Sequence, residues 1–161
     1  MESLDDLLRS MDAEKARVEE EGNRRLEEAR ARLSELSKSF VSSASAAFNA
    51  IAGFTILETT ETEAVTQNLA QATATVHVDA ESELLNVTLD VPMSWRVSED
   101  GVSRGTIGPM RGRVSRKRGD SKIGNPVSFQ YVFAGPTITS PRCYVDPAAL
   151  RSQIVQTIKS L

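Results

Sequence analysis

Residues 4–40 have the sequence LDDLLRSMDAEKARVEEEGNRRLEEARARLSELSKSF, which predicts one long, highly charged helix. Apolar or small residues recur along it in steps of three and four, and Lys15 and Gly22 occupy two positions of the same series. The predicted stripe consists of Leu8, Met11, Val18, Leu26, Ala29, Leu33, Leu36 and Phe40. One extra residue at Gly22 interrupts the 3.5-residue repeat, which is typical of a stutter in a coiled coil.

A helix of this length is expected to need a partner. About 45 residues at ~1.5 Å each span roughly 70 Å, whereas a domain of 100 residues has a radius of gyration of about 13 Å. We therefore expect the helix over residues 3–52 to pair with another chain, either a second copy or a different protein. After Phe40, serines and alanines replace the charges, and these small side chains predict packing of the later helix against the globular part.

In the remainder of the chain, apolar and polar residues alternate as they do in β-strands. Apolar and polar residues alternate over 70–78, 85–91 and 127–133, as in half-buried strands, and residues 54–57 predict a further strand. Turns are expected at 79–82 and 99–101, and the short connections favour an antiparallel meander. Met93 and Trp95 are interpreted as sheet core.

A helix is predicted at the end of the chain. Asp146 is an N-cap followed by Pro147 at the first helical position, and one apolar face follows. That face consists of Leu150, Ile154, Ile158 and Leu161. We expect an α+β fold: a coiled-coil helix over 1–52, then a head over 53–161 in which a small antiparallel meander packs against a C-terminal helix.

Charge is unevenly distributed. Residues 39–95 contain no Lys or Arg, whereas residues 96–124 contain eight. Most of these cations fall in a predicted mobile loop over 108–126, namely Arg111, Arg113, Arg116, Lys117, Arg118 and Lys122. The loop fits contact with nucleic-acid phosphates, a nuclear-localisation patch, or a charged sheet edge that deters strand pairing. Ser115 and Ser121 are candidate phosphorylation sites beside these cations.

The sequence predicts no catalytic centre. His77 stands alone on the polar face of a strand, without a Ser or Cys nucleophile motif, and Cys143 has no evident activating partner. One His and one Cys do not make a zinc site. We expect no enzyme activity, cofactor or metal. An acidic start and the lack of a long apolar run predict a nuclear or cytoplasmic protein, neither secreted nor membrane-spanning.

The order of elements resembles the RWD-type globular heads of eukaryotic kinetochore coiled-coil proteins, although the family's tyrosine–proline motif is absent around Tyr144. The resemblance implies dimerisation through the coiled coil and docking of a peptide or a second head on the globular part. Small acidic secretion chaperones and the peripheral stalk subunits of rotary ATPases share parts of this layout.

Together these features predict a non-catalytic scaffold or adaptor subunit. It would associate with another chain through residues 3–52 and bind a protein partner on its head. The alternative is a nucleic-acid-associated protein that uses the basic segment 111–122.

Overall fold

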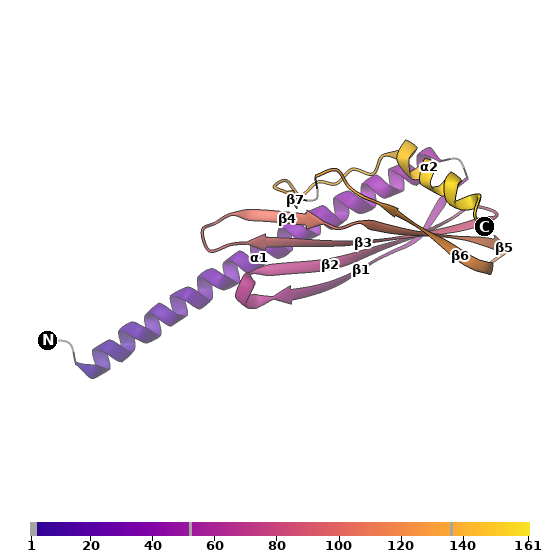
Figure 1. The fold of residues 1–161 in the computed structure, drawn as a ribbon. Coiled ribbons are helices and arrows are strands. Elements are labelled where there is room, and N and C mark those ends of the chain that lie inside the picture. Colours follow the sequence, from indigo (N-terminus) through magenta and orange to yellow (C-terminus); the bar gives the residue numbers. More distant parts are fainter. Residues whose placement is uncertain (1–2, 52, 136) are drawn as a thin grey trace.

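The structure is a computed structural model that describes residues 3–51, 53–135 and 137–161. It confirms the α+β class: a long N-terminal helix, an antiparallel sheet and a C-terminal helix (Figure 1). In chain order the elements are α1 (Leu4–Ala50), β1 (Thr55–Thr66), the 3-10 turn η1 (Gln67–Leu69), β2 (Gln71–Glu81), β3 (Leu85–Val97), β4 (Ser103–Ile107), β5 (Met110–Arg118), β6 (Ser121–Tyr131), β7 (Thr137–Ile138) and α2 (Pro147–Ile158).

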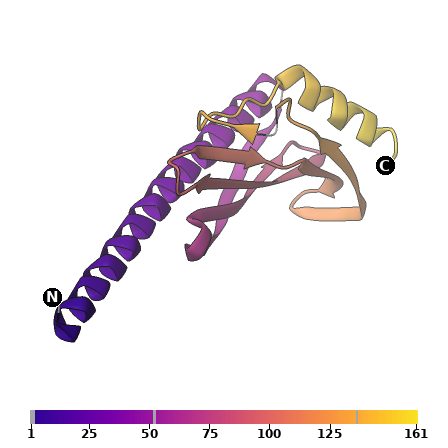
Figure 2. The same cartoon turned by 60° about the vertical axis from the view of Figure 1, so that its left-hand side comes forward.

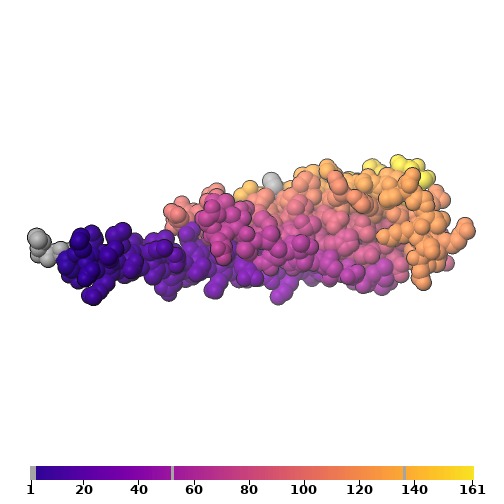
Figure 3. Space-filling view, turned by 90° about the horizontal axis from the view of Figure 1, so that it is seen from below, coloured from indigo at the N-terminus to yellow at the C-terminus, as the bar shows by residue number. Residues whose placement is uncertain are grey.

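Helix α1 crosses one face of the sheet and continues well beyond it (Figures 1 and 2). Its 47 residues make it roughly 70 Å long. It begins where the Ser3 hydroxyl accepts a hydrogen bond from the Asp6 N–H at 3.1 Å, and Ile51 caps its end. The space-filling view shows the first part of α1, in indigo, standing clear of the remaining chain (Figure 3). Among the described residues, neither helix has both the length and the apolar character needed to traverse a bilayer.

The core lies between α1 and the sheet. Small residues on both layers bring them close: Ala29, Ala44 and Ala47 in α1 face the sheet, and alternate residues of β2 are alanine or valine. Phe40 and Phe48 fill the space between them and are fully buried. The predicted packing of the later part of α1 against the globular part is therefore confirmed.

Strand β3 has two different neighbours along one edge. Residues 93–97 pair with β4 and residues 85–90 pair with β5, so the neighbour changes at Pro92. The Pro92 carbonyl accepts a hydrogen bond from the Gly108 N–H at 2.8 Å. Because the N–H and C=O of a strand residue point to the same side, the nitrogen of Pro92, which bears no hydrogen, faces this junction. The proline is therefore accommodated in an interior strand.

Strand β1 is longer than its predicted four residues and forms an edge of the sheet. Almost all of its residues are exposed, and two of its glutamates make polar contacts with α1. Ser37 donates to the Glu61 carboxylate at 3.0 Å, and Arg30 pairs with Glu63 at 3.0 Å. Acidic residues on an exposed edge also discourage pairing with foreign strands.

Helix α2 confirms the predicted cap. The Asp146 carboxylate accepts a hydrogen bond from the Ala148 N–H at 3.1 Å, and Leu150 and Ile154 are buried. The segment that leads to it crosses α1, where two serine hydroxyls accept backbone hydrogen bonds. Ser39 binds the Cys143 N–H at 2.9 Å and Ser43 binds the Val145 N–H at 2.7 Å. These two serines of α1 thus hold the segment that precedes α2 against the surface of α1.

Gly112→Ala is expected to destabilise the protein by about 1–3 kcal/mol, because overpacking strains a filled core. A Cβ at Gly112 would lie 2.0 Å from Cζ of Phe129. Gly22→Ala is the matched control: no side chain crowds that position in the helix, and alanine is favoured there by up to ~1 kcal/mol. Urea unfolding should therefore move in opposite directions for the two variants. Equal shifts would contradict the packing around Phe129.

Candidate functional site

Residues 4–25 of α1 form an overhang that the sheet does not cover. Every described residue from 3 to 20 is exposed, and the sheet begins where Arg25 donates to the Val97 carbonyl at 3.3 Å. Leu4, Leu8 and Met11 have exposed fractions of 80%, 56% and 59%. Together with Leu7 they occupy positions i, i+3, i+4 and i+7, which lie on one helical face. Val18 continues the same face and is 54% exposed.

The predicted pairing stripe is therefore divided into an exposed first half and a buried second half. The prediction that the second half pairs with another chain is corrected. Leu26, Ala29, Leu33, Leu36 and Phe40 are buried in this chain's own core, so they are not available to another helix. Steps of three and four residues suit packing on a sheet as well as packing in a coiled coil. Only Leu8, Met11 and Val18 of the predicted stripe remain exposed.

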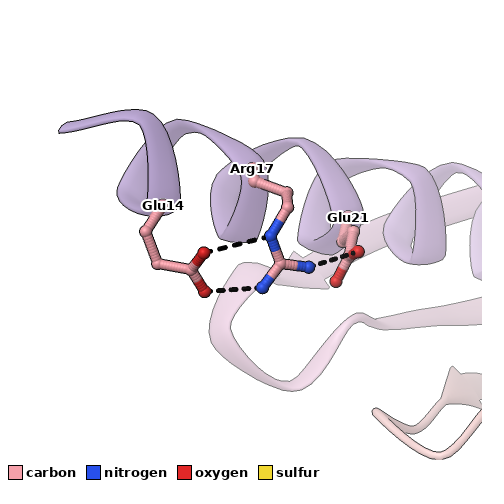
Figure 4. Close-up of polar contacts among 3 residues, drawn as sticks. All are labelled: Glu14, Arg17 and Glu21. Carbon is pink, nitrogen blue, oxygen red and sulfur yellow. Dashed lines mark hydrogen bonds and ion pairs between the residues drawn. The ribbon is translucent and has the colours of Figure 1, made fainter. Parts of the chain in front are cut away.

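A charged cluster lies on the surface of the overhang. The Arg17 guanidinium donates to both carboxylate oxygens of Glu14 and, at 3.0 Å, to Glu21 (Figure 4). These hydrogen bonds with Arg17, and its positive charge, lower the pKa of Glu14. Pairs at spacings of three and four residues support a helix that lacks tertiary contacts. The cluster therefore stabilises the helical form of the overhang without occupying its apolar face.

Acid is expected to loosen the overhang. Because the pKa of Glu14 is lowered by folding, its contribution is complete above the unfolded value near 4.5 and is lost as pH falls through the folded value. Amide hydrogen exchange over residues 12–20, corrected for intrinsic rates, should therefore lose protection in acid. Glu14→Gln should show lower protection at neutral pH and a smaller acid response. Identical profiles for the two proteins would contradict the role of this pair.

The basic segment is a β-hairpin, which corrects the predicted mobile loop over 108–126. Strands β5 and β6 pair with each other, and Gly119, with φ of +59°, lies in the turn between them. Met110, Gly112 and Val114 are the buried alternate residues of β5. The sequence hid this alternation because its central member is a glycine, whose place the Phe129 ring fills.

The hairpin divides its cations between two faces of the sheet. Residues that pair across antiparallel strands lie on the same face. Arg111, Arg113 and Lys117 share one face, which is opposite α1, whereas Arg116 pairs with Leu85 and lies on the other face with Arg118. Lys122 pairs with Lys117. The Lys117 ammonium also binds Glu81 at 2.7 Å and is 10% exposed.

An open groove of about 510 Å³ lies at the tip of this hairpin, between β5–β6, the β2–β3 turn and the end of α2. We call it the tip groove. Its apolar lining consists of Leu84, Leu85, Ile123, Ile158 and Leu161. Leu84, Ile123 and Ile158 are exposed by 68%, 39% and 38%, and Arg116 and Arg118 lie at the rim. Exposed apolar surface bordered by charge is characteristic of binding sites. Sequence reasoning missed this groove because its residues come from three distant segments.

The candidate phosphorylation sites differ in access. Ser115 is only 6% exposed within β5, so a kinase cannot reach it in the folded protein, and that prediction is corrected. Ser121 lies at the start of β6 and is exposed, and it stays a prediction. A phosphate there would reduce the positive charge of the hairpin tip.

His77 has a partner that the sequence did not indicate. Its Nδ1 lies 2.6 Å from the Asp90 carboxylate across β2 and β3, and Arg111 of β5 is the next residue in the same row. With Asp90 accepting from Nδ1–H, the Nε2 atom is a possible proton acceptor. Among the described residues, no three His, Cys, Asp or Glu side chains gather as metal ligands would. The row is a polar ladder on the open face of the sheet.

Three further residues that the sequence singled out, Met93, Trp95 and Cys143, pack in or against the core. Trp95 and Met93 are buried, which confirms their interpretation as core, and the Trp95 indole donates to the Ser103 hydroxyl at 2.7 Å. Burial raises the pKa of the Cys143 thiol to about 11, so the thiol is protonated and unreactive at neutral pH.

Comparisons with known proteins give no match: no family model, curated protein or solved structure is significantly similar to this chain. The resemblance to RWD-type heads stays a prediction. Any functional conclusion must therefore be drawn from the overhang, the tip groove and the polar sheet face themselves.

Proposed function

We propose that this chain is a non-catalytic scaffold or adaptor subunit that joins another protein chain through its overhang. The observation that carries the proposal is the apolar face of Leu4, Leu8, Met11 and Val18, held in water on a helix that is fixed in the core at its other end. Isolated helices in water are marginally stable, and they gain stability when an apolar face is buried. A partner that covers this face supplies that burial.

The anchorage of the overhang favours a scaffold over a flexible tail. Leu33, Leu36 and Phe40 hold the same helix against the sheet, so the direction of the overhang is set by the head. A partner bound near Met11 would be held at a defined distance from the sheet, because the roughly 14 residues from Met11 to Arg25 at ~1.5 Å each span about 21 Å. Fixed spacing between two bound proteins is the useful property of such a subunit.

Photo-crosslinking tests this proposal directly. A photoreactive amino acid is placed at Met11 of the full-length protein in its native cell, and the matched control is Val132, which is 72% exposed on the head. Position 11 should give discrete adducts larger than the 17.5 kDa chain, and position 132 should not. Absent adducts at position 11, or equal yields at both positions, would reject the overhang as a protein-binding surface.

In the same crosslinking experiment, Leu8→Asp is expected to lower the yield of adducts from position 11. Burial of one leucine contributes about 1.5–3 kcal/mol, and about 1.4 kcal/mol is tenfold in affinity. The yield of crosslinks from position 11 at limiting partner concentration should therefore fall about tenfold or more. Val132→Asp, an equally drastic change away from the overhang, should leave the yield unchanged.

The alternative function, binding of nucleic acid by the basic segment, stays a prediction with less support from the geometry. Arg111 and Arg113 lie on the opposite face from Arg116 and Arg118, so the cations do not line a single track for a phosphate backbone. Electrophoretic mobility shifts with double- and single-stranded probes test it. Affinity that falls steeply with salt and with Arg116→Ala/Arg118→Ala would support this alternative.

A further inference from the structure

We propose that the overhang of one copy docks in the tip groove of a second copy, so that identical chains assemble head to tail. This inference rests on the proposed function and names the partner of the same overhang. It follows from two exposed surfaces on one molecule that complement each other in apolarity and in charge.

The overhang offers an acidic amphipathic helix. Its first turns expose Leu4, Leu7, Leu8 and Met11 on one face. Residues 4–14 contain four acidic residues and one basic residue, and two of the acidic residues, Asp5 and Asp6, lie in the first turn. Helices with anchors at i, i+3, i+4 and i+7 bind in apolar grooves on their partners.

The tip groove offers the complementary surface. Its apolar lining is leucine and isoleucine from three segments, and its volume of about 510 Å³ can take several side chains of a helix. Among the described residues, Glu83 is the one acidic residue in the lining, against three cations, Arg116, Lys117 and Arg118. The exposed guanidinium groups of Arg116 and Arg118 border it. Acidic residues of the overhang would meet these cations while Leu4, Leu8 and Met11 enter the groove. Such charge complementarity favours this orientation over helix-to-helix pairing of two acidic overhangs.

The two surfaces lie at opposite ends of the molecule (Figure 1). The overhang extends from one end of the sheet, and the β5–β6 hairpin and the end of α2 lie at the other. Because a rigid helix roughly 70 Å long separates the two surfaces, the overhang of a chain cannot reach the tip groove of the same chain. A contact between unlike surfaces of identical chains is heterologous and generates either a closed ring or an open filament.

Two variants with complementary defects test the inference by light scattering. Leu8→Asp/Met11→Asp disables the overhang and keeps the groove, whereas Arg116→Glu/Arg118→Glu reverses the rim charge and keeps the overhang. All four residues are exposed, so both variants should fold as the wild type, which near-ultraviolet circular dichroism of Trp95 verifies. Leu84→Asp, at a position 68% exposed, is a second groove variant.

The wild type should exceed 17.5 kDa with rising concentration, and each variant alone should stay at 17.5 kDa. An equimolar mixture of an overhang variant and a groove variant should form a complex of twice that mass and no larger, because one working overhang meets one working groove. A groove variant that associates as the wild type does would overturn the inference in favour of helix pairing. A monomeric mixture or a monomeric wild type would also overturn it. The proposed function fails on a different result, namely no crosslinks from position 11 or equal yields from positions 11 and 132.

Discussion

Leu33→Asp/Leu36→Asp is expected to unfold the protein. Both leucines are buried between α1 and the sheet, with exposed fractions of 1% and 0%. A buried Leu→Ala change costs about 2–5 kcal/mol, and an unpaired buried carboxylate adds a further desolvation cost. The free energy of unfolding of a small domain is only about 5–15 kcal/mol, so the double substitution should remove most or all of it. Far-ultraviolet circular dichroism and the yield of soluble protein measure this loss.

Leu8→Asp/Met11→Asp is the matched control on the same helical stripe. These positions are exposed, so the free energy of unfolding at low protein concentration should stay within about 0.5 kcal/mol of the wild type. The contrast distinguishes an intramolecular core from a pairing seam. A folded Leu33→Asp/Leu36→Asp protein with reduced mass in solution would show that these leucines pair with another chain instead.

Trp95→Ala is expected to cost about 3–5 kcal/mol, the range for removal of a large buried aromatic side chain. The Trp95 ring is 1% exposed and covers Gly105 so closely that a Cβ there would lie 2.3 Å from its Cε3 atom. The substitution opens a cavity between α1 and the junction of β3 and β4, and the Ser103 hydroxyl loses its donor. Urea unfolding followed by circular dichroism measures the change in unfolding free energy.

Trp95→Phe separates packing from hydrogen bonding. Phenylalanine retains part of the ring volume and removes the indole donor to Ser103, so the cost should be well below that of alanine. Ser103→Ala removes the same hydrogen bond from the other side and should cost about 0.5–1.5 kcal/mol. Equal losses for Trp95→Ala and Trp95→Phe would show that the hydrogen bond, rather than the packing, stabilises this region.

The helices and most strands were predictable because local signals determine them. The Asp146 cap marked the start of α2, and the alternation in β2 and β3 marked half-buried strands. The partner of the apolar stripe was not predictable. Leu8 and Leu26 belong to the same series of apolar residues, yet Leu26 is buried and Leu8 is exposed. The spacing of the series is the same whether a sheet or another helix covers it.

The β5–β6 hairpin and the candidate site were harder to predict for a different reason. Gly112 occupies a core position that the Phe129 ring fills, and Gly124 and Pro126 interrupt the first half of β6, so only residues 127–131 of the hairpin show a simple alternation. The tip groove combines Leu84, Ile123 and Leu161, which tertiary packing alone brings together. The Asp90 partner of His77 likewise depends on the register between β2 and β3.

Site-resolved amide hydrogen exchange along α1 tests most directly whether this helix is divided into a core half and a binding half. At high dilution, residues 26–48 should exchange only through global unfolding, and residues 4–20 should exchange orders of magnitude faster. Raising the protein concentration should protect residues 4–20 alone. Protection of residues 26–48 that depends on concentration, or slow uniform exchange over the whole helix at high dilution, would contradict the division.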